Sequence, residues 1–391
     1  MKTAKKILCV LLVCIMTAFG SVMAFADDAA LKFDENGQFE IMIFADSQDD
    51  EALEATTTQL MKEALAKYEP DLVVYLGDNT VADGYDNQYT AIQAILAPVV
   101  EADVPFALVF GNHDQEQGVD KEVLLAMYQQ IGGGLCLTYD TPDLYGCGNS
   151  FLPIVSSDGT GIAFNLWFFD SGSSLRDEET GEWLGYDYVR EDQIEWYETT
   201  AAGLALANGG ENVPSIVFQH IIVPEVYEAM YPSLPFGIKD FTYKDVAYLP
   251  VPSFSAHSGF VFEPPCPSYF SAGQFDSWVE TGDVIASFYG HDHTNSFTTT
   301  YKGIDITTVP TVGCNSYSND ITRGVGLITL DESDLSTYSY EVVRMCDLAL
   351  EEGSLLSSVD GGSSTFYCMF MNLVTKMLDA IHNLFNGGIS F

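Results

Sequence analysis

Four of the six histidines in the 391-residue chain stand in short polar stretches that could bind metal ions. The most distinctive stretch is Gly290-His291-Asp292-His293, in which two imidazoles one residue apart can reach the same point from a tight loop. Imidazole nitrogens and carboxylate oxygens are common ligands of divalent ions. Because a His-x-His loop by itself is more often ordinary surface, a metal site is predicted only if other parts of the chain supply partners.

Four earlier stretches supply these partners, each directly after a predicted buried strand. They are Asp46-Ser47-Gln48, Gly77-Asp78-Asn79, Gly111-Asn112-His113-Asp114 and Gln219-His220. The intervals 46–78 and 78–112 each match one strand–helix unit of roughly 30 residues. In open α/β sheets, sites form outside the carboxyl ends of the strands. We therefore expect these side chains to meet in one crevice.

The elements that must position these residues follow an alternating pattern. In the first half we expect strands at 39–45, 72–76 and 106–110, and helices at 53–68, 89–100 and 121–131. This alternation predicts βαβ units and a buried parallel sheet. In the second half we expect helices at 191–206 and 271–280, and strands at 150–155, 162–169, 215–218, 284–289, 297–301, 304–308, 326–330 and 338–343. Residues 228–267 lack a clear period and are expected to form an ordered loop over the site.

Together the five polar stretches resemble the calcineurin-like metallophosphoesterases, whose pattern is Asp-x-His, Gly-Asp, Gly-Asn-His-Asp/Glu, a lone His and Gly-His-x-His. The stretches at 168–172, 192–196 and 219–225 resemble the branch with purple-acid-phosphatase-like and fungal phosphatase-like members. The resemblance spans about 39–343. It implies an α/β, four-layer fold in which two mixed β-sheets pack as a sandwich flanked by helices.

The resemblance also implies a set of site residues. Asp46, Gln48, Asp78 and His293 would hold one metal ion, and Asp78, Asn112, His220 and His291 the other. Two neighbouring dications need an anionic bridge, which Asp78 would supply, and the pair would activate water and hold the phosphoryl oxygens. His113 would protonate the leaving oxygen or stabilise the transition state, and Asp114 would orient its imidazole. A structural hydrogen bond for His113 and a structural turn role for Asp114 remain alternatives.

Two positions depart from the family pattern. Gln48 stands where histidine is usual, and an amide oxygen is a harder and weaker ligand than imidazole, so Mn²⁺ or Mg²⁺ is expected to be preferred over Zn²⁺. We expect two divalent cofactor ions and favour Mn²⁺ for them, with Fe, Zn or Mg as alternatives. Val81 stands where purple acid phosphatases carry a tyrosine, so a purple iron–tyrosinate centre is not expected.

The expected function is hydrolysis of small organic phosphomonoesters or diesters by attack of a metal-bridging hydroxide. Gln48 also suggests a nucleotide pyrophosphatase. An alternative of a different class is a non-catalytic, metal-binding surface protein.

Composition and the N-terminal residues bear on location and partners. Residues 1–26 resemble a secretory signal peptide, with Lys2, Lys5 and Lys6 before an apolar run and Ala24-Phe25-Ala26 as the cleavage site. We therefore expect a secreted, cell-surface or periplasmic protein. Removal of this segment takes away three lysines and no acids, so the net charge of −41 becomes about −44. Such a charge argues against nucleic acid as a partner and indicates a small phosphorylated substrate whose charge the metals neutralise. The oligomeric state is left open.

The remaining expectations concern cysteines and the C-terminal region. Export permits disulfides, and Cys136 with Cys147 could close a short clip, while other pairings stay open. Residues 27–348 are expected to form the phosphoesterase domain, 349–365 a Gly/Ser-rich flexible linker and 366–391 an amphipathic helix and tail. The polar stripe of this helix is Asn372, Lys376, Asp379 and Asn383. Docking on its own domain or on a second copy is favoured over contact with a membrane surface.

Overall fold

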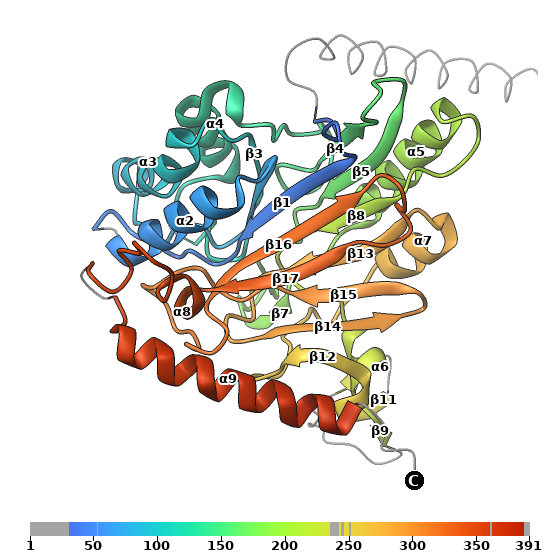
Figure 1. The fold of residues 1–391 in the computed structure, drawn as a ribbon. Coiled ribbons are helices and arrows are strands. Elements are labelled where there is room, and N and C mark those ends of the chain that lie inside the picture. The colour runs from blue at the N-terminus through green and yellow to red at the C-terminus, as the bar shows by residue number, and fades with distance from the viewer. Residues whose placement is uncertain are drawn as a thin grey trace, which may run out of the picture.

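Two β-sheets pack face to face at the centre of the protein, and helices cover their outer faces (Figure 1). The computed structural model describes residues 31–386 except 53, 117, 235–241, 244–245, 250–251 and 360–361. The proposed signal peptide therefore lies outside the described residues. The four layers confirm the predicted fold class.

The first sheet has five strands in the order β17 (Ser339–Arg344), β16 (Gly324–Asp331), β1 (Gln38–Phe44), β2 (Leu72–Leu76) and β3 (Phe106–Val109). Strands β1, β2 and β3 are parallel, and β16 and β17 complete the sheet in antiparallel fashion. The sheet is therefore mixed. Every side chain of β2 is buried, as expected of a central parallel strand covered on both faces.

The second sheet has seven strands in the order β12 (His257–Phe260), β14 (Ser296–Tyr301), β15 (Ile304–Thr308), β13 (Val284–Tyr289), β8 (Ser215–Phe218), β5 (Ile162–Phe168) and β4 (Ser150–Val155). The four strands β15, β13, β8 and β5 are parallel. The inner faces of both sheets share one apolar core that includes Ile43 and Val74 from the first and Phe218 and Phe288 from the second.

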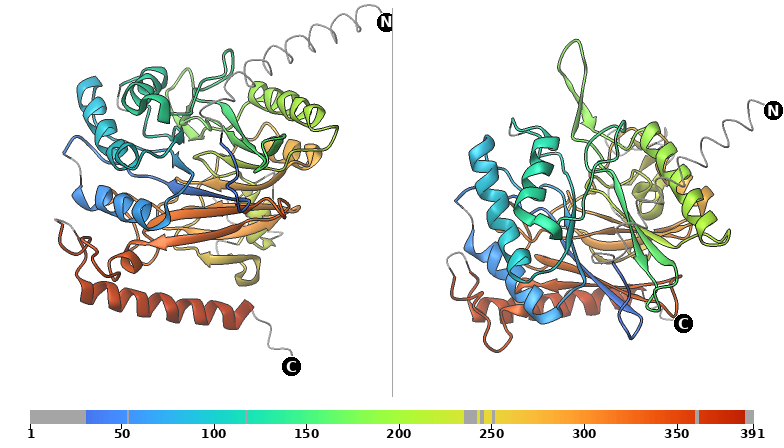
Figure 2. Two further views of the ribbon diagram at one scale, coloured as in Figure 1. Left: turned by 45° about the horizontal axis from the view of Figure 1, so that its top comes forward. Right: turned by 90° about the horizontal axis from the view of Figure 1, so that it is seen from above.

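Two further apolar clusters attach the helices. On the first sheet lie α2 (Ala55–Tyr68), α3 (Tyr85–Glu101), α4 (Lys121–Gly132) and the short α8 (Met345–Leu348). On the second lie α5 (Glu191–Ala207), α6 (Val226–Met230) and α7 (Gln274–Thr281). Figure 2 shows the helices on the two sides of the sandwich. A single-turn 3₁₀ helix, η1 (Gly133–Leu135), follows α4.

The segment expected to be one irregular loop, 228–267, contains regular structure in its described part. Strands β9 (Ser233–Leu234), β10 (Thr242–Tyr243) and β11 (Val246–Tyr248) form a small sheet, and η2 (Phe254–Ala256) follows. Strand β12 then pairs with β14 and extends the large sheet by one edge strand. These strands are too short to show a period of two in the sequence. The hairpin of β6 (Ser174–Arg176) and β7 (Trp183–Tyr186) was also not predicted.

The flexible linker expected at 349–365 is not what the described part of this segment shows. The Glu63 carboxylate on α2 accepts hydrogen bonds from the Ser354 hydroxyl and the Leu355 amide, both at 2.7 Å. The Leu356 side chain is buried, and Lys67 forms an ion pair with Glu351. The buried Leu356 side chain and the two carboxylate oxygens of Glu63 therefore attach this segment to the domain, although its Gly/Ser content predicted flexibility.

The C-terminal helix α9 (Thr365–Asn386) lies against α8 and η2 (Figure 1). It turns small and polar residues toward the domain: Cys368 and Thr375 are buried, and Asn372 donates to Asp347 at 2.7 Å. Most of its large apolar side chains point away from the domain, among them Phe366, Met369, Phe370, Leu373, Met377 and Ile381, whereas Met371 packs against the apolar cluster of the first sheet. In the described residues, no helix has the length and apolar content needed to cross a bilayer.

The clip suggested between Cys136 and Cys147 is not formed, because both are free thiols. Cys136 lies beside Phe106 at the start of β3, where the two residues form an isolated bridge. The amide of Cys147 instead donates to Asp170 at the end of β5. The turn-rich segment between the cysteines therefore spans the two sheets and does not fold back on itself.

Candidate metal centre

Five strands from both sheets place the predicted ligands at one end of the sandwich. Asp46 follows β1, Asp78 follows β2 and Asn112 follows β3, whereas His220 follows β8 and the pair at 291 and 293 follows β13. All of them are buried. The carboxyl ends of the parallel strands meet here, so the predicted ligands lie close together at one end of the sandwich, as the sequence predicted.

The ligand atoms form two groups that share one carboxylate. In the first group, atoms of Asp46, Asp78 and His293 all lie within 4.8 Å of one another, and in the second the same holds for Asp78, His220 and His291. The two groups match the two sets predicted for two metal ions. Asp78 belongs to both, which is the position of a bridging ligand.

The nitrogens and oxygens without hydrogen-bond partners identify the atoms that face the ions. Asn112 Oδ1 and His291 Nε2 are buried and have no hydrogen-bond partner among the described residues. His220 Nε2, also buried, lies 3.1 Å from Asp78 Oδ2. Buried polar atoms normally have a partner, so two unsatisfied atoms here indicate a missing ligand or ion. Together with the Asp78 carboxylate they suit a divalent cation.

The outer nitrogens of two imidazoles fix their tautomers. His220 Nδ1 lies 2.9 Å from the carbonyl of Leu76, and His293 Nδ1 lies 2.9 Å from the carbonyl of Tyr317. A carbonyl can only accept, so each Nδ1 carries a proton and each Nε2 faces the cluster, where it would offer its lone pair to a bound metal.

The electrostatics of the site favour positive charge. Burial opposes protonation of His220, but the facing carboxylates Asp78 and Asp46 raise its pKa to about 10. Burial likewise raises the pKa of Asp46, whereas neighbouring imidazoles, above all His220, hold the pKa of Asp78 below its usual value against the effect of burial. Burial and the neighbouring His220 lower the pKa of His291 to about 3. In the absence of metal, the proton on His220 therefore partly neutralises the carboxylates Asp78 and Asp46. Bound divalent cations would neutralise them more fully.

Unusual backbone geometry brings the ligands together. Asp46, Gln48, Asp78 and His291 all have positive φ, between 40° and 71°. Residues other than glycine seldom adopt this conformation, and it gathers at functional sites. The glycine preceding a ligand supplies room: a Cβ on Gly111 would lie 2.1 Å from Asp78 Oδ1, and one on Gly77 would lie 2.5 Å from His220 Nδ1.

Gln48, the departure from the family pattern, lies inside the site. Its Nε2 is 3.2 Å from Asp78 Oδ2, and the residue is buried. The oxygen and nitrogen of an amide exchange places by a simple flip. The amide oxygen can thus be turned toward the cluster in place of an imidazole nitrogen.

His113 borders the cluster and is more open to solvent. Its amide donates to Asp78 Oδ1 at 2.7 Å, whereas its imidazole side chain is 42% exposed. The imidazole Nδ1 donates to Glu116 Oε2 at 2.6 Å. The ring is therefore held at the entrance of the site, where a leaving group would depart.

Asp114 does not contact this ring, contrary to the orienting role predicted for it. Its carboxylate accepts from the amides of Gly111 at 2.8 Å and Asn79 at 3.0 Å. Burial and the charge of Asp78 raise its pKa to about 6. Asp114 fixes the loop that carries Asn112, and Glu116 has the orienting place. The i,i+3 spacing of His113 and Glu116 was the signal in the sequence.

Two tyrosines flank the histidine pair, and sequence reasoning missed both. The Tyr186 ring, from the β6–β7 hairpin, meets His291 edge-on with centroids 4.3 Å apart. Tyr317 stacks on His293 at 4.2 Å and is itself 57% exposed. Aromatic surface therefore borders the site on two sides.

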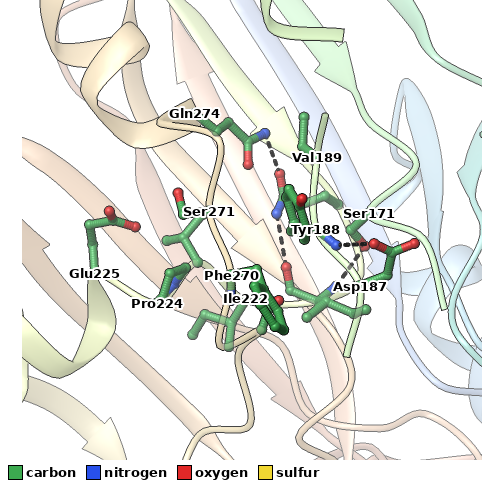
Figure 3. Close-up of a pocket in the computed structure, with 14 residues that line it drawn as sticks. Ser171, Asp187, Tyr188, Val189, Ile222, Pro224, Glu225, Phe270, Ser271 and Gln274 are labelled. Atoms are coloured by element: carbon green, nitrogen blue, oxygen red, sulfur yellow. Dashed lines mark hydrogen bonds between the residues drawn. The ribbon is translucent and has the colours of Figure 1, made fainter. Parts of the chain in front are cut away.

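A pocket opens beside the metal cluster, and Figure 3 shows its lining. It is lined by Gln219 and Ile221, the chain neighbours of His220, but by none of the predicted ligands. Gln274 Nε2 donates to Gln219 Oε1 at 2.7 Å, and the Ile221 amide donates to the Ser171 hydroxyl at 3.0 Å. These bonds hold the loop that presents His220.

The sequence profile of the calcineurin-like phosphoesterases matches residues 39–295, which hold all the predicted ligands. The chain belongs to this family. It is accordingly a phosphoric ester hydrolase with a centre for two divalent metals, in agreement with the two groups that share Asp78.

Several known proteins are similar to this chain. The phosphoesterase is 28% identical over 317 residues to a probable inactive purple acid phosphatase 29 from Arabidopsis thaliana, covering 73% of this chain and 74% of that protein. It is 29% identical over 176 residues to phosphatase DCR2 of Saccharomyces cerevisiae, covering 43% of this chain and 29% of that protein. A dimetal phosphatase from Danio rerio has a TM-score of 0.45 at 15% identity, covering 75% of this chain and 93% of that one.

Proposed function

We propose that this phosphoesterase is exported and hydrolyses small organic phosphomonoesters or diesters, with Mn²⁺ as the favoured metal. The observation that carries the proposal is that two buried atoms around the shared Asp78, Asn112 Oδ1 and His291 Nε2, have no hydrogen-bond partner among the described residues. A site kept only for structure would have satisfied these atoms from within the protein.

The protein residues have separate tasks in this reaction. When bound, the two ions supply the Lewis acidity that activates water and neutralises the phosphoryl oxygens. His113 lies outside both groups, so its imidazole can deliver a proton to the leaving oxygen. Glu116 fixes the direction of that ring through its hydrogen bond to Nδ1.

A small substrate suits the surroundings of the site. The chain carries a net charge of −41, so a polyanion would be repelled except where the metals reverse the local potential. Tyr186 and Tyr317 border the histidines and offer apolar or stacking contact to an organic group. The substrate class we propose is therefore a phosphate ester with a compact organic part.

Two other functions have an observation in their favour. The amide of Gln48 in place of an imidazole favours a nucleotide pyrophosphatase. The name of the Arabidopsis relative contains the word inactive, which favours a metal-binding protein without turnover. Against the latter, this chain has the carboxylates and imidazoles of both groups, with the Asn112 amide and His113 beside them.

One experiment separates these functions. The mature protein would be stripped of metal, reloaded with Mn²⁺ or Zn²⁺ and assayed on an aryl phosphomonoester, its diester and a nucleotide pyrophosphate. We expect the monoester or diester to be hydrolysed fastest, and with Mn²⁺. A preference for the pyrophosphate would establish the second function, and metal binding without turnover of any substrate would establish the third.

Export is tested separately on the expressed protein. We propose that residues 1–26 are removed and that 27–348 form the catalytic domain. N-terminal sequencing of protein recovered outside the cytoplasm should begin at Asp27. An intact Met1 on active protein would contradict the proposal.

A further inference from the structure

Two buried cysteines from different helices place their sulfurs in contact. Cys346 lies in α8 and Cys368 in α9, and their Sγ atoms are 2.7 Å apart. Both residues are almost fully shielded from solvent, at 4% and 0% exposure. Nonbonded carbon atoms, which are smaller than sulfur, rest about 3.5–4.0 Å apart. The two sulfurs are therefore closer than separate atoms would lie, though not yet at the ~2.05 Å of a disulfide bond, so a small movement would allow the bond to form.

The helix α9 has few other attachments to the domain. Tyr367 donates to Asp320 at 2.5 Å, and Asn372 donates to Asp347 at 2.7 Å. Most of its large apolar side chains face away from the domain, and of those that the structure describes Met371 alone packs, partly buried, on the apolar cluster of the first sheet, so apolar burial contributes little to holding the helix in place. Hydrogen bonds that replace bonds to water contribute only modestly to stability. A helix docked through its small and polar side needs a stronger connection than these contacts provide.

We propose that Cys346 and Cys368 form a disulfide that fastens α9 to α8. All six cysteines of the described residues are free thiols in this structure, and of these Cys346 and Cys368 are the pair whose sulfurs are in contact. A disulfide that closes a loop stabilises the folded protein, because it lowers the conformational entropy of the unfolded chain. Here the loop runs from 346 to 368 and contains the segment 349–359, which is itself anchored on α2 through Glu63.

The bond forms by thiol–disulfide exchange with a disulfide donor, either a protein oxidoreductase or a low-molecular-weight disulfide. One cysteine loses its proton and attacks the donor, which releases one thiolate and leaves a mixed disulfide. The second cysteine then attacks this mixed disulfide and releases the other donor thiolate. Two electrons pass to the donor, and the two thiol protons go to its thiolates.

The timing of this step follows from burial. Burial raises the pKa of the Cys346 thiol, and the docked Cys368 shields it from any donor. A thiolate is the species that attacks. The exchange therefore takes place while α9 is undocked, and docking afterwards protects the bond.

The test uses the full mature protein, which is reduced and unfolded and then refolded with reduced and oxidised glutathione, so that the thiols meet the donor before α9 docks. Free thiols are alkylated after denaturation, and the chain is cut by a glutamate-specific protease at the exposed Glu351 and Glu352, between the two cysteines. We expect a fragment with α9 that separates only on a reducing gel. Mass spectrometry should find Cys346 and Cys368 in one linked pair, lighter by two hydrogen atoms.

Matched variants keep the outcome decisive. Cys346→Ser and Cys368→Ser should each release the α9 fragment on a non-reducing gel and add one alkylated cysteine, the freed partner. Cys136→Ser should leave the linked fragment intact. Complete alkylation of both cysteines in oxidised wild-type protein, or a link between other cysteines, would overturn the proposal without reference to any variant.

Discussion

The imidazole Nδ1 of His113 lies 2.6 Å from Oε2 of Glu116, and this pair stands at the open side of the two-metal centre. His113 contributes its backbone amide to Asp78, so its side chain is free for another task. We expect His113→Ala to reduce kcat by about 10²–10⁴-fold, the range typical of a lost general acid, with metal content retained. Metal analysis beside steady-state kinetics checks this, and loss of metal would show that the ring is a ligand.

Glu116 should act through His113 and have a smaller effect. Glu116→Gln keeps the length of the side chain and removes the charge, so we expect kcat to fall about tenfold, the size of a weakened charge-assisted hydrogen bond. KM should change little. In the His113→Ala background the same substitution should have no further effect, and an additive loss would place Glu116 elsewhere in the mechanism.

Asp78 is expected to be required for both metals. Asp78→Asn removes the anionic bridge between the two groups, so metal content and turnover should both be lost. Asp103→Asn is a matched control, because Asp103 has a similar left-handed φ of 57° and lies exposed on the surface. The control should bind metal normally. Retention of two ions by Asp78→Asn would contradict the bridging role.

Gln48 is expected to set the metal preference. Gln48→His replaces an amide beside Asp78 Oδ2 with an imidazole, which is the better ligand for Zn²⁺. We expect the ratio of Zn²⁺-supported to Mn²⁺-supported activity to rise by about tenfold or more, since one ligand change is worth roughly 1.4 kcal/mol or more in relative affinity. An unchanged ratio would mean that Gln48 does not coordinate the metal.

Gly111 should tolerate no side chain. A Cβ there would lie 2.1 Å from Asp78 Oδ1 and 2.5 Å from the Asp78 amide, so Gly111→Ala must displace the bridging ligand. A displacement of about 1 Å can cost about 10²-fold in rate. Gly134→Ala, where a Cβ meets nothing within 4 Å, should leave activity unchanged. Equal kinetics in the two variants would argue against the tight approach of these loops.

A buried ion pair should stabilise the loops behind the site. Lys121 Nζ lies 2.8 Å from Asp170 Oδ1, and both side chains are buried. Lys121→Met leaves the Asp170 charge alone and should lower the free energy of unfolding by about 3–5 kcal/mol. The double variant Lys121→Met/Asp170→Asn should lose less than the sum of the two single losses. Urea denaturation measures this, and simple additivity would show that the residues do not interact.

The sequence was most informative for the repeated βα units of the fold. Apolar runs and βα spacing predicted the strands that carry Asp46, Asp78 and Asn112, because buried parallel strands leave a clear pattern. The partition of His291 and His293 between two groups came from the family resemblance, and the geometry agrees with it. Side-chain partners were harder, since Asp114 and Glu116 are both near His113 and only the turn of the loop decides which carboxylate reaches the ring.

Short and edge elements were lost for physical reasons. Strands β9 to β12 and the β6–β7 hairpin are too short for their hydrophobic pattern to differ from that of a loop. The amphipathic pattern of α9 was visible, but the face that docks was not, because ordinary burial of the apolar side would have turned Cys368 outward. The contacts of Leu356 and Glu63 were equally invisible in a Gly/Ser-rich composition.

The left-handed backbone of Asp46, Gln48, Asp78 and His291 has a conformational cost that bears on which residues can replace them. At these positions glycine or asparagine would fold at lower conformational cost, by roughly 1–2 kcal/mol per residue for glycine. Only the need for a ligand side chain opposes that replacement. A lineage that stopped using metals would keep the turns and drift toward glycine and asparagine at these four positions. The ligand roles we propose for these four residues would offset the conformational cost that they carry.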